Sequence, residues 1–241
     1  MRDNLTLDYF SASHELYDVP YFTPRLEEIY KERNVGITLN YRLKGIDTFS
    51  KKATFEKVEK IKTEVLNEET GKMEQTDQTV KTPVVFDYDF MHFVPPMSAP
   101  DFVRDAGLGW TEGKLAAESW VMTDKESLVH MKYGNIISLG DCAGIPTSKT
   151  SAAIRMQVPV AAKNLISLME GKEPQEKYNG YAACPIVTEY GKVLMCEFDY
   201  DKKPLPTMPF IDASKEQWVS WLLKVYFLKP MYFYGMLKGY M

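Results

Sequence analysis

The stretch Gly134–Ala153, GNIISLGDCAGIPTSKTSAA, constrains this chain more than any other segment. It opens with a short apolar run, Ile136–Leu139, of the kind found in buried strands. Gly140 and Asp141 end that run, and a hydroxyl-rich turn leads into helix-forming residues from Ala152 onward. The pattern predicts a strand, a polar turn and a helix N-terminus, whose unpaired N–H groups attract phosphates and electron-rich rings. An ordinary connection with a capped helix gives the same pattern, so the motif leaves both interpretations open.

Composition limits the classes of protein. The 241 residues suffice for one large or two modest domains, and the net charge of −4 does not favour a nucleic-acid partner. The residues at the start form no signal peptide, and no run of 18 apolar residues predicts a membrane-spanning helix. The three histidines are scattered, and the spacing of the three cysteines fits no zinc pattern, so we expect no metal site.

The first part of the chain predicts a parallel unit. Residues 4–11 and 35–41 have the pattern of strands, and residues 24–33 carry apolar side chains at helical spacing. This β–α–β order is typical of Rossmann-type folds. Hairpin strands are expected over 43–56, 58–66, 84–88 and 90–94, with a polar surface turn over 67–79. Gly107, Gly109 and Gly113 do not form a dinucleotide fingerprint, because their spacing is wrong and no strand precedes them.

The three cysteines have different predicted settings. Cys184 is expected in a loop before Pro185, where a thiol is easier to reach, and its role stays open on pattern alone. Cys196 is expected inside a strand, where a cysteine is usually a small buried hydrophobe. Cys142 is also expected to be structural, although one or two of the three could be redox-active.

The last segment, residues 214–241, combines aromatic and apolar residues with lysines. We expect a helix that begins near Ser214 and Gln217, at a spacing typical of a capping box, and a break at Pro230. Aromatic residues and lysines beside an apolar face are typical of a helix lying in a membrane interface. A helix pair that packs on the domain, or on another copy of the chain, would have the same composition.

Taken together, these motifs resemble a known family. The pattern GDCAGIPTSKTSAA, the later KYNGYAACPIVTEYGKVLMCEFDYD, HFVPPMSAPDFV at 92–103, NLTLDYFSA and the aromatic end are similar to sulfide:quinone oxidoreductases, especially the branch that includes the mitochondrial enzyme. The resemblance covers essentially the whole chain. It implies an α/β, Rossmann-like flavoprotein with two dinucleotide-binding domains, represented here in part, with amphipathic helices at its end.

The resemblance also implies a reaction and a set of site residues. Hydrosulfide would attack a cysteine disulfide or trisulfide beside FAD, sulfane sulfur would leave, and two electrons would pass through FAD to a quinone. Cys184 would be one redox cysteine. The flavin would contact Gly140, Asp141, Lys149, Thr150, Ser151, Ala152 and Ala153. The quinone or membrane surface would be bordered by Trp218, Trp221, Tyr226, Phe227, Tyr232 and Phe233.

One departure from the family pattern shapes these expectations. The family's G-x-G-x-x-G turn is absent, and neither Cys142 nor Cys196 matches the family's other redox cysteine. We therefore expect a C-terminal portion that lacks the N-terminal FAD-binding half, and that alone neither holds FAD tightly nor turns over. Residues 1–133 would be the second dinucleotide-binding-like domain, 134–213 the end of the FAD domain, and 214–241 the quinone-associated helices.

The expected partners follow from the same resemblance. They are sulfide, a quinone, the missing half and a membrane surface, with further copies of the chain as an additional partner. The protein would be peripheral to a bacterial cytoplasmic membrane or to the mitochondrial inner membrane. Two alternatives stay open: a related flavoprotein, such as a type II NADH dehydrogenase or a flavocytochrome sulfide dehydrogenase subunit, and a non-catalytic membrane-surface or interaction protein left by gene splitting.

Overall fold

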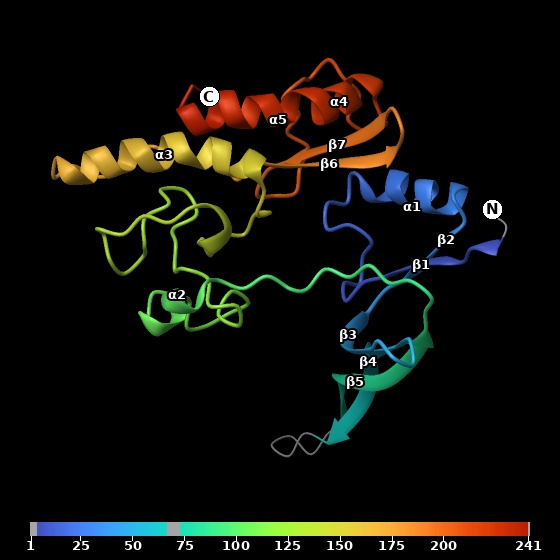
Figure 1. Cartoon of the computed structure of the whole chain (residues 1–241). Coiled ribbons are helices and arrows are strands. Elements are labelled where there is room, and N and C mark those ends of the chain that lie inside the picture. Colours follow the sequence, from blue (N-terminus) through green and yellow to red (C-terminus); the bar gives the residue numbers. More distant parts are fainter. Residues whose placement is uncertain (1–3, 67–72, 241) are drawn as a thin grey trace. The chain divides into compact units, whose positions relative to one another are not determined.

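A computed structural model describes residues 4–66 and 73–240 (Figure 1). The chain forms two compact units: Met1–Asp18 with Thr23–Val94, and Val19–Phe22 with Pro95–Met241. The contacts therefore group residues 95–133 with the later part of the chain. The expected functional division at residues 133 and 134 stays a prediction.

The first unit opens with the predicted β–α–β arrangement. Strand β1 (Leu7–Phe10) pairs in parallel with β2 (Val35–Thr38), and helix α1 (Thr23–Glu32) lies between them in sequence. Helix α1 buries Leu26 and Ile29, which are spaced three residues apart and so share one face. The mixed α/β fold class predicted from the sequence is confirmed by this unit.

An antiparallel meander completes the first unit. Its strands are β3 (Tyr41–Asp47), β4 (Lys52–Leu66) and β5 (Met73–Asp87), in that spatial order. Residues 73–79, expected in a turn, belong to β5 because they pair with β4 throughout, and residues 67–72 of that turn lie outside the described part. Residues 90–94 form no strand. The rings of Phe10, Tyr41, Phe55 and Phe86 pack together and join the meander to β1.

The second unit begins with short elements. Helix α2 (Asp101–Asp105) is followed by an irregular segment and by the 3-10 turn η2 (Gly140–Cys142). The strand expected at Ile136–Leu139 was wrong, since Ile137 forms only an isolated bridge with Val129. The backbone bonds at this bridge run from the His130 N–H to the Ile136 carbonyl and from the Ser138 N–H to the Leu128 carbonyl. The 19-residue helix α3 (Ser151–Met169) starts where the sequence predicted a helix.

The rest of the second unit is a hairpin covered by a helical segment. Strands β6 (Ala182–Glu189) and β7 (Lys192–Phe198) are antiparallel, and α3 contacts β6. A tail helix, defined here as residues 218–238, follows as α4 (Trp218–Leu222), η3 (Leu223–Phe227), α5 (Leu228–Pro230), η4 (Met231–Gly235) and η5 (Met236–Lys238). Its α4 part packs against β7 (Figure 1).

Two sequence expectations about the tail helix were wrong. The helix begins at Trp218 and Gln217 makes no side-chain cap, because Ser214 donates instead to the Asp212 carboxylate at 2.6 Å. Pro230 does not break the helical path, which continues through Met231. Wide π-type turns lie on both sides of Pro230, and such turns change the hydrogen-bond pattern that a proline would otherwise interrupt.

Candidate functional site

The site is built around η2 and the first turn of α3. Thr150 has an extended backbone, and its hydroxyl accepts a hydrogen bond from the Ala153 N–H at 3.2 Å, which caps the helix. The N–H groups of Ser151 and Ala152 belong to the same first turn, where a helix offers them no acceptor of its own. Ser151 is exposed. This end of α3 therefore presents hydrogen-bond donors at the surface.

Gln157 holds the turn that precedes this helix end. Its side-chain oxygen accepts from the Gly140 N–H at 2.7 Å, and the side chain is only 2% exposed. Gly140 has a φ of +68°, and a Cβ there would lie 3.2 Å from Ile154, so glycine suits the position. Asp141, the next residue, is exposed. The turn thus directs a carboxylate outward beside the donors of α3.

Lys149 lies between these groups but is engaged within the protein. Its ammonium group donates to the Ala143 carbonyl at 2.6 Å and sits 4.0 Å from the centre of the Trp120 ring. Burial lowers the pKa of Lys149, while the charges of Asp141 and Cys142 raise it. Lys149 therefore braces the turn, and its expected contact with a flavin stays a prediction.

Cys184 lies in strand β6, not in the loop expected from sequence. Strand pairing with β7 begins at Ala182, so the small residues before Pro185 are part of the sheet. Cys184 is half-buried, and its partner in the register, directly opposite on β7, is Cys196. The cysteine is thereby held on a paired strand and not on a loop.

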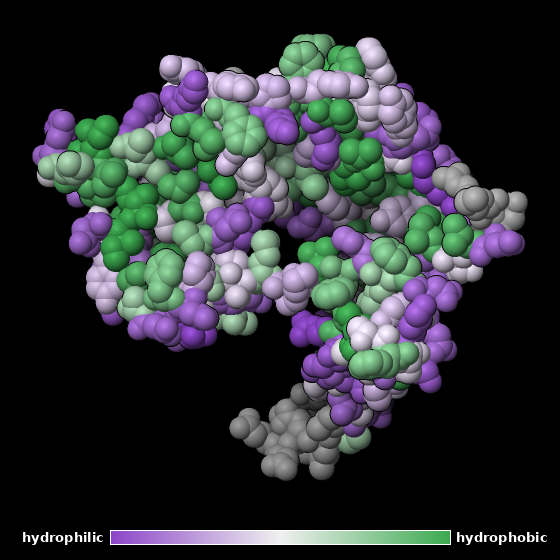
Figure 2. All heavy atoms as spheres, in the orientation of Figure 1, coloured by the Kyte–Doolittle hydropathy of each residue, from purple (hydrophilic) through white to green (hydrophobic). Residues whose placement is uncertain are grey.

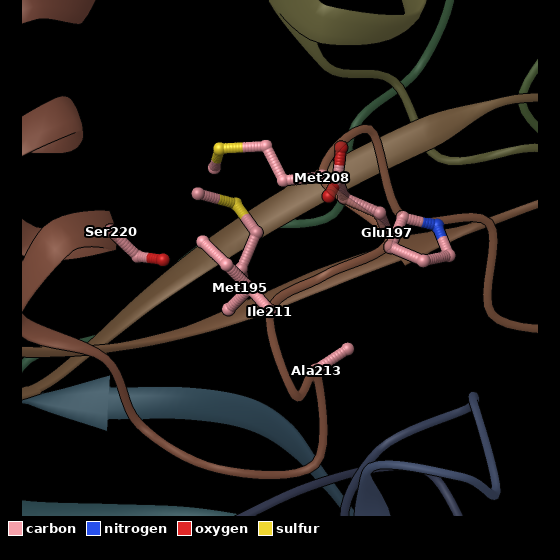
Figure 3. A pocket seen from close by; sticks show the side chains of 7 residues that line it. Met195, Glu197, Met208, Ile211, Ala213 and Ser220 are labelled. Atoms are coloured by element: carbon pink, nitrogen blue, oxygen red, sulfur yellow. The ribbon is translucent and has the colours of Figure 1, made fainter.

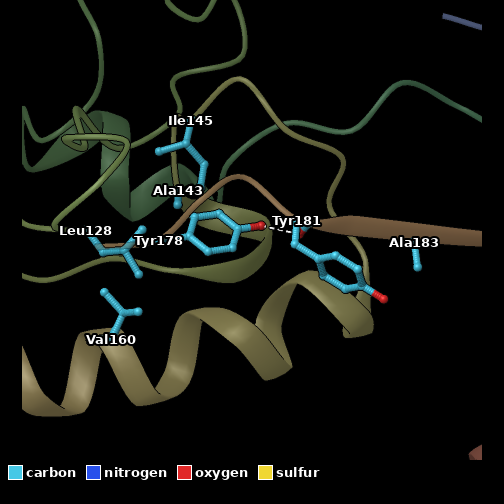
Figure 4. Packing of buried hydrophobic residues seen from close by; sticks show 8 residues of the cluster. Leu128, Ala143, Ile145, Val160, Tyr178, Tyr181 and Ala183 are labelled. Atoms are coloured by element: carbon cyan, nitrogen blue, oxygen red, sulfur yellow. Dashed lines mark hydrogen bonds between the residues drawn. The ribbon is translucent and has the colours of Figure 1, made fainter. Parts of the chain in front are cut away.

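A shared core brings the η2–α3 region and the β6 strand together. Ala143 and Ile145 follow η2, Ala183 precedes Cys184, and all three belong to one buried cluster with Tyr178 and Tyr181 (Figure 4). The cluster as a whole consists of Leu128, Ala143, Ile145, Val160, Ala161, Tyr178, Tyr181 and Ala183. One further hydrogen bond joins these two segments, and another lies within the segment that leads into β6.

The first bond runs from the Thr147 hydroxyl to the Gly180 carbonyl at 2.9 Å. In the second, the Tyr178 hydroxyl donates to the Tyr181 carbonyl, next to the start of β6 (Figure 4). Gly180 approaches the Tyr200 ring so closely that a Cβ would lie 2.3 Å from it. The segments that carry residues 140–153 and Cys184 are therefore held together by one core.

A buried carboxylate lies on β7 beside this core. Glu197 is 6% exposed and accepts from the hydroxyls of Tyr181 and Thr207, each at 2.5 Å, and from the Thr207 N–H at 3.1 Å. Burial, followed by the bond to Glu197, raises the pKa of Tyr181 to about 12. Glu197 is therefore stabilised by three donors, as a buried acceptor requires.

A small pocket opens on the Glu197 side of the hairpin. It is lined by Met195, Glu197, Pro206, Met208, Ile211, Ala213 and Ser220 (Figure 3). Its volume is about 10 Å³, enough for about one water molecule. The buried hydroxyl of Ser220 has no hydrogen-bond partner within the described part of the chain. A water molecule here would satisfy it.

The tail helix exposes most of the aromatic residues predicted to face a membrane or quinone. Five of the six are at least 40% exposed: Trp218, Tyr226, Phe227, Tyr232 and Phe233. Trp221 differs, because only 7% of it is exposed and its ring packs on Tyr190 of the hairpin turn at 4.9 Å. Trp221 therefore anchors the helix, and its expected role at the quinone or membrane surface stays a prediction.

Within residues 4–66 and 73–240, no helix is long and apolar enough to cross a membrane, and no group of three or more potential metal ligands is present.

Several buried polar residues were not predicted from the sequence. Gln157 and Asn164 are buried on α3, and Asn164 donates to the carbonyls of Ser127 and Glu176 at 2.9 Å. The available signal was their helical spacing with the apolar Ala153 and Val160, which places polar groups on the buried face.

Comparisons with known proteins give a consistent result. No family model matches the chain. It is 33% identical over 239 residues to the mitochondrial sulfide:quinone oxidoreductase of Mus musculus, covering 99% of this chain and 47% of that protein. The counterpart in Dictyostelium discoideum is 36% identical over 239 residues with the same coverage, and that of Schizosaccharomyces pombe is 29% identical over 206 residues, covering 85% of this chain and 39% of that protein.

Two solved structures share the fold. A chain in the cryo-EM structure of the Tetrahymena thermophila mitochondrial ATP synthase has a TM-score of 0.69 at 21% identity, covering 93% of this chain and 48% of that one. The X-ray structure of the sulfide:quinone oxidoreductase from Aquifex aeolicus has a TM-score of 0.54 at 15% identity, covering 93% and 49%. The chain spans about half the length of the curated relatives from mouse and Dictyostelium. Along nearly its whole length, the chain is therefore similar to the sulfide:quinone oxidoreductases.

Proposed function

We propose that this chain is the C-terminal portion of a sulfide:quinone oxidoreductase, and that it supplies a redox cysteine, one side of the flavin site and the quinone-facing tail helix. The observation that carries the proposal is the shared core that joins the η2–α3 turn to the strand bearing Cys184. The similarity to sulfide:quinone oxidoreductases over 239 residues supports the same reading.

The residues at η2 and the start of α3 fit one side of FAD. The exposed Asp141 carboxylate can accept hydrogen bonds from ribityl or ribose hydroxyls, and the Ser151 and Ala152 N–H groups can donate to a phosphate or to a flavin ring. When bound, FAD would supply a two-electron acceptor. Gln157 and Thr150 keep the turn and the helix cap in place for that contact.

Cys184 is proposed to form the covalent bond to the sulfur atom that comes from sulfide. Its half-buried position on a paired strand limits its movement while leaving a route for small molecules. In the overall reaction, sulfide loses two electrons to become sulfane sulfur, and quinone gains two electrons and two protons to become quinol. The sulfur passes through bonds to cysteine by thiol–disulfide chemistry.

The tail helix is proposed to lie against the membrane surface and border the quinone. Trp218, Tyr226 and Phe227 are more than half exposed, and lysines accompany them along the helix. Such a surface favours an interfacial position, with rings at the acyl boundary and lysines at the headgroups. The curated relatives are named as mitochondrial proteins, which supports a mitochondrial location, and we propose the inner membrane as the surface.

Helix α3 exposes an apolar side that supports the need for a further part of the enzyme. Val158, Leu165, Ile166 and Met169 are each at least 40% exposed, and Figure 2 shows hydrophobic side chains at the surface over α3. We propose that an FAD-binding half, the other part of the relatives' length, covers this side. The chain expressed by itself would then bind FAD weakly.

The test is sulfide-dependent reduction of a short-chain ubiquinone by the protein purified from its source with every partner that remains bound. We expect flavin in the preparation and quinone reduction in the wild type. Cys184→Ser should abolish the reduction and keep the flavin, and Cys142→Ser should keep both. Undiminished activity in Cys184→Ser would exclude the assigned role of this cysteine.

A second candidate is a non-catalytic component of a membrane complex. The structural match with the higher TM-score, 0.69, is a chain in a mitochondrial ATP synthase structure. If the purified protein co-elutes with a large membrane complex and shows neither flavin nor sulfide-dependent quinone reduction, this candidate replaces the proposed enzymatic function.

A further inference from the structure

Strands β4 and β5 extend beyond β3 as a two-stranded arm, defined here as residues 58–66 and 73–81. The register between β3 and β4 ends at Lys57, whereas the register between β4 and β5 continues without a break along their whole length. Ala53 and Phe55 are buried at the base of this hairpin, but no arm side chain that the structure describes is buried. A two-stranded hairpin without a core is only marginally stable in water, so a further strand would stabilise the arm.

Strand β5 has a free outer edge, because the described strands of this sheet lie in the order β3-β4-β5. The Val58 N–H donates to the Asn40 carbonyl at 2.9 Å, on the side of β4 away from β5. Val58 and its partner Lys81 are therefore not a hydrogen-bonded pair, and the N–H and C=O groups of Lys81 point outward from the sheet edge. This direction alternates along a strand, so Asp77 and Thr79 present their backbone groups at the same edge.

The charges on this edge fit a second copy of the same edge. When two β5 strands pair in antiparallel fashion about a two-fold axis at Thr79, Asp77 of each copy lies directly opposite Lys81 of the other. Opposite charges in directly opposed positions stabilise a pair of strands. An axis at Asp77 or at Lys81 would instead place like charges opposite each other. An axis at Gln78 or at Val80 would pair neither charge with an opposite charge, so the register centred on Thr79 is the one that the charges favour.

Lys81 is already oriented toward the face on which this contact would form. Its ammonium nitrogen lies 3.6 Å from a carboxylate oxygen of Glu56, and 58% of its side chain is exposed. Asp77 lies four residues away on the same strand and points to the same face, because alternate strand residues share a face. Lys81 can therefore keep Glu56 as a neighbour and reach Asp77 of a second copy.

Pro83 marks one end of the edge that is open to pairing. Its missing N–H would point outward, like that of Thr79, so the proline leaves the pairing with β4 intact. In the register centred on Thr79, Pro83 lies opposite Gln75 of the other copy, and its carbonyl can still accept the Gln75 N–H. The outer edge of the arm on β4 is shorter, because β3 and the residue before it cover that edge as far as Val58.

We propose that two copies of this chain associate through the free edges of β5, in the register centred on Thr79. The two arms then form one continuous antiparallel sheet in the order β4-β5-β5-β4. Backbone hydrogen bonds across the new edge supply the affinity, and the two contacts between Asp77 and Lys81 fix the register. A two-fold contact of this kind is closed, so it gives a dimer and no longer assembly. The dimer does not depend on sulfide chemistry or on the proposed function.

Charge reversal in the full chain tests the dimer and its register. The mass is measured by light scattering over a concentration series, in a non-ionic detergent that covers the exposed rings of the tail helix. We expect the wild type to reach the mass of two chains. Asp77→Lys and Lys81→Asp should each raise the dissociation constant at least about tenfold, because each places like charges opposite each other. Glu64→Lys, at an exposed position on β4 of the same arm, is the control and should dimerise like the wild type.

Two combinations separate docking from local damage to the arm. The double variant Asp77→Lys, Lys81→Asp keeps both altered side chains and restores opposite charges across the axis, so it should dimerise like the wild type. An equal mixture of the two single variants should form heterodimers, because one copy then carries two lysines and the other two aspartates at the paired positions. Thr79→Pro removes only an outward N–H and should also weaken the dimer at least about tenfold.

Three results would overturn the proposal. A wild type that stays a single chain at every concentration would identify Lys81 and Pro83 as residues that protect the edge from pairing. Single variants that dimerise as tightly as the wild type would place the contact on another surface, such as the tail helix or α3. Weakened single variants whose mixture and double variant both fail to recover would exclude the register centred on Thr79.

Discussion

The ammonium group of Lys224 donates a hydrogen bond of 2.5 Å to the backbone carbonyl of Pro185, the residue that follows Cys184. Lys224 belongs to the tail helix and Pro185 to β6. A single side chain therefore fastens the segment proposed to face the membrane to the strand that carries Cys184. Trp221, packed on Tyr190 of the hairpin turn, adds a second anchor between the tail helix and the β6–β7 hairpin.

Replacing Lys224 by methionine should loosen this connection. A hydrogen bond from a charged group contributes about 1.5–3 kcal/mol, and the half-exposed setting of Lys224 places the loss at the lower end. We expect faster amide hydrogen exchange in the tail helix and in β6. Lys229→Met, at an exposed position of the same helix, is the matched control. Equal exchange in the two variants would show that the contact does not hold the tail helix.

Replacing Gly180 by alanine should disturb the entry to β6. Gly180 has a φ of +84°, and a Cβ would lie 2.3 Å from the Tyr200 ring. Gly171 has a φ of +71° with nothing within 4 Å, so Gly171→Ala carries only the backbone cost of about 1 kcal/mol. Urea unfolding should show a clearly larger loss for Gly180→Ala. Equal losses would mean that the Tyr200 ring moves aside freely.

The stability of the second unit should fall in alkaline solution. The pKa of Tyr181 is raised to about 12, whereas a tyrosine in an unfolded chain titrates near 10. The folded chain thus holds a proton that the unfolded chain has lost, so this stabilising effect is complete below about pH 10 and is lost as the pH rises to about 12. Burial also raises the pKa of Tyr178 and Tyr200, in the same direction.

Tyr181→Phe tests the assignment. The variant should be less stable at neutral pH, because Glu197 loses a donor, yet its unfolding free energy should fall less steeply between about pH 10 and 12. Tyr190→Phe, at a position that is 85% exposed, is the control. A slope in Tyr181→Phe equal to that of the wild type would assign the effect to the other tyrosines.

Binding to vesicles should depend on the exposed rings of the tail helix. Trp218 and Phe227 are 62% and 61% exposed, and burying a large apolar side chain contributes about 1.5–3 kcal/mol. The double variant Trp218→Ser, Phe227→Ser should therefore bind vesicles of phosphatidylcholine and an anionic phospholipid at least about tenfold more weakly. Phe49→Ser, at a fully exposed position of the first unit, should bind like the wild type. Unchanged binding of the double variant would favour packing against protein.

Local patterns predicted the elements that depend on local sequence. The β1–α1–β2 unit and the start of α3 were predicted because helical spacing and a polar cap are visible in short windows. Cys184 was expected in a loop because Gly180 and Pro185 flank it. Pairing with β7 nevertheless includes Ala182, Ala183 and Pro185. The pairing with the second strand of the hairpin decided that outcome.

Burial of polar groups was the hardest feature to predict. Gln157 and Glu197 resemble surface residues in composition, but their partners are Gly140, Tyr181 and Thr207, which only the folded chain brings near. For Cys196, the strand position predicted the burial of the thiol correctly. The register that places Cys184 opposite it is contained in no local pattern.

The most direct test of the proposed function locates the sulfur. The protein purified with its partners is supplied with sulfide and a short-chain ubiquinone, stopped during turnover with an alkylating reagent, and digested with trypsin. We expect sulfane sulfur on residues 178–192, which contain Cys184, and none on residues 133–149, which contain Cys142. Quinol formation without any sulfane sulfur on residues 178–192 would contradict the role assigned to Cys184.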